Sequence, residues 1–252
     1  MLYGLAKLQY LSIRPASVSD AGKLYFSFPI VFIANALRRP LLPSWAIRVR
    51  TEDSVLAIRP GVANLAIVCS TFEPKTRSWF NIKPGETFLD VGANVGYYTV
   101  KALRAGARVV AVEPDPSNYE LLRLNAPEAN AVNVALGSAD GTASLYLNRD
   151  SSLSSMVPRP GTRRMDVKLM TIDSLTQVEG VDRFDWVKID AEFHEKEILE
   201  GGHEALSKTK NLIVEVATGN MESVKRILGG MGLTVKDLEF MGDSANLFAT
   251  RN

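Results

Sequence analysis

The chain has 252 residues, of which 46% are apolar and 23% are charged, as in an ordinary globular protein. Its 29 basic and 28 acidic residues give a net charge of +1 without any basic block, which argues against duplex nucleic acid as the main partner. Cys69 is the only cysteine, which excludes an intrachain disulfide and a zinc site built from several thiolates. Because the N-terminus also lacks a signal-peptide pattern, we expect a cytoplasmic protein.

The first part of the chain reads as an N-terminal extension over residues 1–79, ahead of a main domain over residues 80–252. A helical or irregular lead-in comes first. Alternating apolar and polar residues at 46–51 and 55–59 then predict a β-hairpin. A helical linker over 63–80 follows the hairpin.

The lead-in contains one strongly apolar stretch, LYFSFPIVFIANAL at residues 24–37. It is shorter than the roughly 20 apolar residues that a membrane span needs. Pro29 also lies inside it. We expect a packed segment, and the alternative is peripheral contact with a membrane surface or with a partner.

From residue 86 onward, apolar strands alternate with helices. The strands are predicted at 86–91, 108–113, 131–136, 184–190 and 211–217, and the helices at 94–105, 116–125, 194–200 and 221–228. Two runs, 142–148 and 167–172, add strands after the third of these, and 232–240 with 245–250 predict a terminal hairpin. The predicted fold class is therefore α/β: a Rossmann-like, doubly wound, mostly parallel sheet with a C-terminal antiparallel hairpin.

A glycine turn follows the first strand of this pattern, in FLDVGANVGYYT at residues 88–99. Gly92 and Gly96 let the backbone pass close beneath a ligand, and Asn94 is one of the few other residue types that tolerate left-handed geometry. The dinucleotide fingerprint G-x-G-x-x-G has a middle glycine that is missing here, and the Asp90 carboxylate would repel a pyrophosphate. That carboxylate suits the sulfonium and ammonium charges of S-adenosylmethionine (SAM), so the turn favours SAM as cofactor.

A second acid supports the same cofactor. The next strand, in RVVAVEPDP, ends in Glu113, about 20 residues after Gly92. A carboxylate there can accept hydrogen bonds from both ribose hydroxyls, as in NAD and SAM sites. Asp90 and Glu113 could instead only cap the following helices, because acids favour first turns. Their position at the ends of two consecutive strands favours the cofactor site.

Several motifs occur in the order typical of one enzyme family. They are FLDVGANVGYYT, VVAVEPDPSNYELLRLN, NVALGSADGTASLYL, SSLSS, VKLMTIDSL and DWVKIDAEFHEKEILEGG. Over roughly residues 80–217 the chain thereby resembles the FkbM-type methyltransferases. The resemblance implies a class I SAM-dependent fold and methyl transfer to a hydroxyl of a sugar, glycolipid or small natural product.

The resemblance also implies site residues. It implies a cofactor turn, a ribose contact and an adenine contact at Asp90, Gly92, Asn94, Gly96, Glu113, Ala135 and Leu136. It places Asp190 and Glu192 beside the reacting methyl group. One position departs from the family's D-x-E-G-x-E, because Phe193 stands at the glycine and is followed by His194. A bulky ring there is expected to reshape the acceptor pocket.

The segment KIDAEFHE carries the candidate catalytic groups. If the backbone stays extended, Asp190, Glu192 and His194 point the same way. An alcohol acceptor gains from a base, and we expect Asp190 or Glu192 in that role with His194 as competitor. The alternative, which we do not favour, is a divalent metal held by Asp190, Glu192 and Glu215 that orients an acceptor diol. Glu195 is expected only to favour the start of the next helix.

Two other functions compete with this prediction. Nucleic-acid methyltransferases of this fold, including tRNA and rRNA enzymes, often carry N/D-P-P-Y after the fourth strand, where this chain has DAEF. A non-catalytic binding module would have no need of the intact turn, the ribose acid and the acidic pair. We therefore expect a small-molecule or glycan acceptor and consider nucleic acid the poorer partner.

Overall fold

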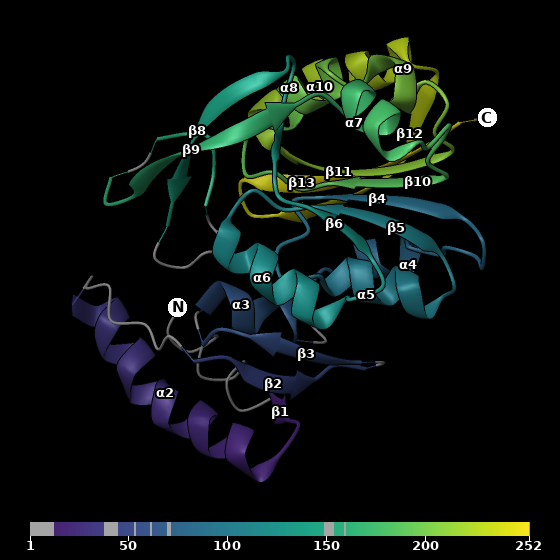
Figure 1. Cartoon of the computed structure of the whole chain (residues 1–252). Helices are drawn as coiled ribbons and strands as arrows, with labels where there is room; N and C mark the ends of the chain where they lie inside the picture. Colours follow the sequence, from purple (N-terminus) through teal and green to yellow (C-terminus); the bar gives the residue numbers. More distant parts are fainter. Residues whose placement is uncertain are drawn as a thin grey trace.

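The computed structural model describes most of the chain. The described residues are 13–37, 45–52, 54–60, 62–69, 72–148, 154–158 and 160–251. Within them a central sheet separates two layers of helices, and a small N-terminal part packs against one layer (Figure 1).

The central sheet has seven strands in the order β12-β13-β11-β10-β4-β5-β6. Their bounds are β4 Thr87–Val91, β5 Arg108–Val112, β6 Asn130–Val132, β10 Trp186–Ile189, β11 Asn211–Ala217, β12 Leu233–Met241 and β13 Ser244–Arg251. The pairs among β4, β5, β6, β10 and β11 are parallel, and β13 runs antiparallel to both β11 and β12. The predicted fold class, with its one antiparallel strand in the terminal hairpin, is confirmed.

Helices cover both faces of this sheet. On one side lie α7 Ile172–Glu179, α8 Glu195–Glu200, α9 His203–Leu206 and α10 Met221–Gly230, and on the other α4 Pro74–Trp79, α5 Tyr97–Arg104 and α6 Pro116–Asn125 (Figure 1). Strand β4 is buried along its whole length: Leu89 and Val91 pack into one hydrophobic cluster and Phe88 into the other. A strand covered on both faces reads as a continuous apolar run, which explains why its sequence is so regular.

Two predicted elements need correction. The third sheet strand, expected over 131–136, is split: β6 ends at Val132, and Ala135–Leu136 form β7 in a separate sheet with β8 Gly141–Leu147 and β9 Arg163–Met170. The strand expected over 167–172 ends at Met170, because the Thr171 side chain accepts a hydrogen bond from the Ser174 N–H and starts helix α7. That helix was missed, although a threonine cap before an apolar residue is a helix-start signal.

Within its described residues, the N-terminal part forms a small sheet and three helices. They are β1 Arg14–Pro15, α2 Val18–Leu37, β2 Ile47–Arg50, β3 Val55–Ile58, α3 Val62–Ile67 and α4, so the predicted hairpin is confirmed and the predicted helical linker consists of two helices, α3 and α4. The side chain of Asn125 on α6 bonds both the N–H and the carbonyl of Ala57 on β3, at 2.7 and 2.9 Å. Trp79 on α4 stacks on Phe248 of β13 at 5.6 Å between ring centroids. The boundary between the two predicted domains at residue 79 stays a prediction.

Helix α2 contains the apolar stretch of the lead-in. Leu24 and Val31 are buried, but Tyr25, Phe26 and Ile33 are exposed on the outside of the molecule. Among the described residues, no helix combines the length and apolarity needed to cross a bilayer. Surface contact of this helix with a membrane stays a prediction.

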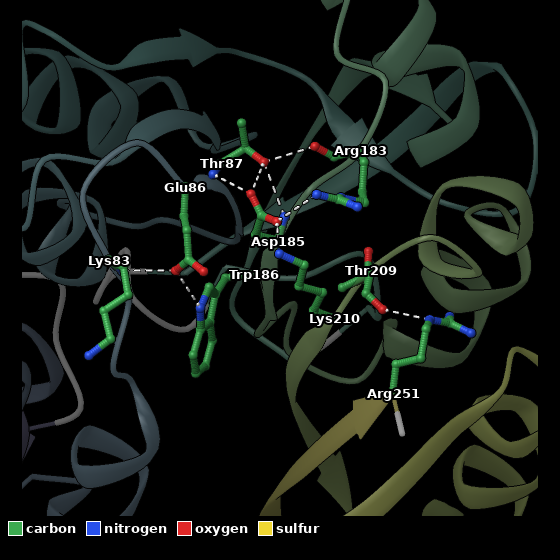
Figure 2. Close-up of polar contacts among 9 residues, drawn as sticks. All are labelled: Lys83, Glu86, Thr87, Arg183, Asp185, Trp186, Thr209, Lys210 and Arg251. Atoms are coloured by element: carbon green, nitrogen blue, oxygen red, sulfur yellow. Dashed lines mark hydrogen bonds and ion pairs between the residues drawn. The ribbon is translucent and has the colours of Figure 1, made fainter.

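The amino ends of the central strands are tied together by one buried carboxylate, Asp185 (Figure 2). It accepts hydrogen bonds from the N–H and hydroxyl of Thr87, at 3.0 and 3.1 Å, and ion pairs with Lys210 at 2.9 Å and Arg183 at 3.2 Å. Burial alone would raise the pKa of Asp185, but the bonds from Lys210 and Thr87 outweigh it and lower that pKa to about 2. This end of the sheet is thus fixed by structural contacts.

Candidate active site

A cavity of about 340 Å³ lies at the carboxyl ends of the central strands. In open α/β sheets this is the edge at which ligands bind. Of the predicted site residues, the cavity wall includes Asp90, Gly92, Asn94, Glu113, Ala135, Leu136, Asp190, Glu192, His194 and Glu215. Gly96 is not in the wall and lies at the start of helix α5 behind it. Residues far apart in the chain therefore meet at one site.

The glycine turn has the left-handed backbone that its sequence predicts. Gly92, Asn94 and Gly96 have φ of 75°, 53° and 92°. The N–H groups of Gly92 and Ala93 both donate to the carbonyl of Val112 on β5, at 2.9 and 3.0 Å. A side chain at Gly92 would clash, because its Cβ would lie 1.8 Å from the backbone oxygen of Asp190. Glycine at this position thus lets the turn touch the strand end that carries the predicted catalytic acids.

The two predicted cofactor acids are both buried under this turn. Asp90 accepts a hydrogen bond from the Thr99 hydroxyl at 2.6 Å, and burial raises its pKa to about 6. Glu113 accepts from the N–H groups of Asn94 and Asp115, each at 2.9 Å, so it joins the turn to the second strand. The Asn118 side chain is a further hydrogen-bond partner of Glu113, and the acceptor capacity that remains on this carboxyl group is available to a ribose hydroxyl.

A side-chain oxygen of the turn has no hydrogen-bond partner among the described residues. The Asn94 Oδ1 is buried and accepts no hydrogen bond from the residues that the structure describes. A buried acceptor without a donor costs free energy, so it marks a position where a ligand donor fits. SAM carries hydrogen-bond donors in its ammonium group and ribose hydroxyls. The acceptor oxygens of Asn94, Asp90 and Glu113 match these donors.

Stability should depend on pH through Glu113. Burial raises the pKa of this carboxyl from its ordinary 4.5 to about 8, so between these values the folded protein holds a proton that the unfolded chain has lost. The stabilisation that the protonated Glu113 carboxyl contributes is fully present below pH 4.5 and is lost as the pH rises through 8. Glu113→Gln has no carboxyl group to titrate. Between pH 5 and 8 its free energy of unfolding, measured by urea titration, should therefore fall less steeply with pH than that of the wild type, by up to about 1.4 kcal/mol per pH unit.

Glu204→Gln, at an exposed glutamate, controls for the loss of one surface carboxylate in that series. Equal pH slopes for the wild type and Glu113→Gln would contradict the assignment of a buried, protonated Glu113.

The loop after β10 differs from the predicted extended backbone. Glu192 and Phe193 have left-handed φ of 51° and 79°, so the strand-like alternation that would align Asp190, Glu192 and His194 does not occur. All three still line the cavity. Phe193 does not, and its side chain is 47% exposed, so the expected reshaping of the acceptor pocket by this ring is not observed.

Glu195 holds this loop in place, a role that was not predicted. Its Oε1 accepts hydrogen bonds from the N–H groups of Ala191 and Phe193, both at 3.1 Å. Burial raises the pKa of Glu195 to about 7. The only sequence signal was an acid at the start of a helix, which does not distinguish a loop clamp from an ordinary N-terminal charge.

Phe193 stores backbone strain that glycine would relieve. A residue with a Cβ pays roughly 1–2 kcal/mol in the left-handed region, whereas glycine does not. We therefore expect Phe193→Gly to be more stable than Phe193→Ala by about 1 kcal/mol, the reverse of the usual order of these two residues. Thermal and urea unfolding of the two variants checks this, since both lack the ring. A more stable alanine variant would show that the loop has another conformation.

Two charged residues of the cavity wall were also missed. Lys188 on β10 is buried and donates to Asp190 Oδ2 at 2.7 Å. Burial by itself would lower the pKa of Lys188, but Asp190 and Glu73 outweigh it and raise that pKa, so the ammonium stays charged. Glu73, just before α4, is buried in the same wall. The sequence signal for Lys188 was a lysine inside the apolar run WVKI. Nothing in the linker sequence distinguished Glu73.

His194 and Glu215 complete the polar wall. Burial lowers the pKa of His194, whose Nδ1 lies 3.5 Å from a carboxylate oxygen of Glu197. Glu215 on β11 accepts from the Ser244 hydroxyl at 2.7 Å. Burial and the neighbouring Asp190 raise the pKa of Glu215 to about 8. The site thus joins a SAM-type turn to a polar wall that can bind hydroxyl groups and accept a proton.

The model of the family described as Methyltransferase FkbM domain matches residues 90–232, more than half of the chain. The chain belongs to the FkbM methyltransferase domain family. The predicted resemblance is therefore confirmed, and the FkbM domain of this chain is a SAM-dependent methyltransferase domain.

Curated relatives match about half of this chain at moderate identity. The hexuronic acid methyltransferase AglP of Haloferax volcanii is 30% identical over 140 residues, which cover 52% of this chain and 55% of that protein. A ribosomal protein L11 methyltransferase of Burkholderia pseudomallei is 30% identical over 144 residues, which cover 54% of this chain and 46% of that protein. The chain spans about half the length of these curated relatives.

Solved structures resemble the chain more distantly. The tRNA m1G37 methyltransferase of M. jannaschii has a TM-score of 0.49 at 10% identity, over 82% of this chain and 55% of that one. The magnesium protoporphyrin IX methyltransferase of Synechocystis PCC 6803 with bound SAM has a TM-score of 0.43 at 16% identity, over 67% of this chain and 71% of that one. Likenesses this distant say nothing about the acceptor.

Proposed function

We propose that the FkbM domain methylates a hydroxyl group of a sugar, glycolipid or small natural product, with SAM as methyl donor. The observation that carries the proposal is one cavity whose wall holds both the predicted SAM turn and a group of hydroxyl-binding carboxylates. The 30% identity to a hexuronic acid methyltransferase supports a sugar as acceptor.

The cofactor is assigned to the turn side of the cavity. In this proposal its ammonium and ribose groups bind Asp90, Asn94 and Glu113, while Gly92 and Gly96 allow the close approach of the backbone. Ala135 and Leu136, which are buried in the cavity wall, flank the adenine. SAM supplies a methyl group already activated by a sulfonium, so the protein chiefly has to align the acceptor and exclude water.

The acceptor is assigned to the polar side. The hydroxyl proton must leave as the new C–O bond forms, and Asp190, Glu192 and His194 are the proposed groups that bind the hydroxyl and receive this proton. Asp190 is the foremost of them, because Lys188 fixes its carboxylate and its backbone touches Gly92. The lowered pKa of His194 leaves its imidazole neutral at pH 7, so it is able to accept a proton.

Two measurements test this function. Calorimetric titration should show SAM binding to the wild-type chain and binding at least tenfold weaker to Glu113→Ala. Radiolabelled SAM should then transfer its methyl group to members of a panel of uronic acids, neutral glycosides and phenolic natural products, and not to bulk RNA. Absent SAM binding would overturn the cofactor assignment, and labelling of RNA alone would overturn the acceptor class.

A further inference from the structure

Three carboxylates from distant parts of the chain converge on one wall of the cavity. They belong to Glu73 before α4, Asp190 after β10 and Glu215 on β11, and one oxygen of each lies within 4.8 Å of the others. Glu73 belongs to the N-terminal part and enters the site through a backbone with φ of 45°, in the left-handed region. A glutamate in that conformation costs roughly 1–3 kcal/mol, which the surrounding packing must offset.

Glu73 is the least satisfied of the three. Its side chain is buried, with only 3% of the residue exposed, and its Oε2 accepts from the Tyr98 hydroxyl at 2.6 Å. Its Oε1 has no hydrogen bond of normal geometry in the described part of the chain, and the Asn246 side chain has only a small effect on this carboxylate. A buried carboxylate oxygen without a donor is costly, so this atom calls for a cation or a donor from outside the protein.

Each of the other two carboxylates accepts a hydrogen bond at one of its oxygens. Lys188 donates to Oδ2 of Asp190 and Ser244 to Oε1 of Glu215, so each acid keeps its second oxygen for a ligand. The Lys188 ammonium, which also lies 4.8 Å from the Tyr98 ring centre, is the neighbouring positive charge. In the fully ionised form that a bound cation favours, three carboxylates and one ammonium leave two negative charges, and the buried Asp90 nearby adds to this field.

We propose that Glu73, Asp190 and Glu215 hold one divalent cation with oxygen ligands, of the Mg²⁺, Mn²⁺ or Ca²⁺ type. An all-carboxylate set selects these hard cations over zinc or copper. Two oxygens bound to one Ca²⁺ lie at most about 4.6–5.2 Å apart, so three oxygens within 4.8 Å of one another come within reach of one ion after small side-chain shifts. The site differs from the one expected from sequence, because Glu73 takes the place of Glu192.

The role of this cation rests on the proposed function. A cation held between the three carboxylates and the acceptor would orient two neighbouring hydroxyl groups of the acceptor. It would also lower the pKa of the hydroxyl that is methylated. It would explain why an otherwise repulsive group of acids stands beside the reacting centre. Its binding to the protein is nevertheless measurable without SAM and without any acceptor.

The test measures cation binding to the full-length chain directly. Free Mn²⁺ is counted by electron paramagnetic resonance as it is added, and Mg²⁺ and Ca²⁺ are added as competitors. We expect one saturable site in the wild type and at least tenfold weaker binding in Glu73→Gln and in Glu215→Gln. Both variants should fold, since each removes one of three crowded like charges, and a thermal melt of each confirms this.

Glu192→Gln and Glu204→Gln are the matched controls. The first removes a carboxylate that lines the same cavity outside the cluster, and the second removes an exposed one. Both should keep the wild-type Mn²⁺ affinity. No saturable site at millimolar Mn²⁺, or an affinity unchanged in both cluster variants, overturns the proposal. SAM titrations on the same samples separate that result from a failure of the cofactor assignment.

Discussion

Gly92→Ala should abolish SAM binding and destabilise the whole domain. The added methyl group would lie 1.8 Å from the backbone oxygen of Asp190, and φ at this position is 75°, so neither the space nor the backbone accepts a side chain. The turn must therefore move away from the end of β10, which separates the proposed SAM turn from the proposed catalytic loop. We expect a loss of at least ~3 kcal/mol in unfolding free energy and a SAM dissociation constant raised at least a hundredfold.

Urea unfolding and calorimetric SAM titration measure these two effects. Gly229→Ala is the matched control, because this glycine lies exposed in α10 with nothing within 4 Å of an added Cβ. It should be neutral or stabilise the chain by about 0.5–1 kcal/mol. A Gly92→Ala variant with wild-type SAM affinity would mean that the cofactor does not use this turn.

Asp190→Asn should lower turnover by about 10²–10⁴-fold while SAM binding stays within about threefold of the wild type. The asparagine keeps the shape of the side chain, but it does not take up the hydroxyl proton of the acceptor and does not neutralise the positive charge of Lys188. Because Glu73 and Asp90 also lie near Lys188, the buried ammonium keeps negative neighbours and the fold should survive. Steady-state kinetics on the acceptor identified from the panel, together with SAM titration, separates the loss of chemistry from a loss of cofactor.

Asp166→Asn controls for the removal of an aspartate elsewhere. Asp166 lies on β9 with its side chain 62% exposed and paired with Arg164. Turnover of this control should stay within twofold of the wild type. If Asp190→Asn also keeps its turnover, the proton leaves by another group, and the same assay on Glu192→Gln and His194→Gln identifies it.

The periodic parts of the fold could be predicted from sequence, because each local pattern agrees with the final structure. Strand β11 and helix α6 match their predicted ranges at both ends. In α6 the boundaries are local: the Asp115 side chain accepts from the Ser117 N–H, and Pro116 starts the helix. Helix α7 was missed, since its apolar start continues the strand pattern of β9 and only the Thr171 cap separates them.

The proposed cofactor side of the site follows from local sequence, whereas the proposed acceptor side does not. The turn and the Glu113 contact depend on residues next to two consecutive strands. The left-handed loop at Glu192 and Phe193 contradicts the backbone preference of both residues, and the Glu195 clamp that imposes it acts through tertiary contacts. Glu73 reaches the cavity from a linker, and no sequence pattern in that linker predicts that its side chain lines the cavity.

The segment around Glu73 is anchored to the far end of the chain. Glu239 on β12 accepts hydrogen bonds from the N–H groups of Lys75 and Thr76, at 3.0 and 2.6 Å, and so fixes the start of α4. Glu73, Met241 and Ser244 all line the cavity yet lie outside the family match at residues 90–232. We therefore expect related chains to share the methyl-donor half of the site and to differ in the flanking residues that line its proposed acceptor side. Sequence divergence outside the matched segment is therefore where changes in substrate among such proteins should be sought.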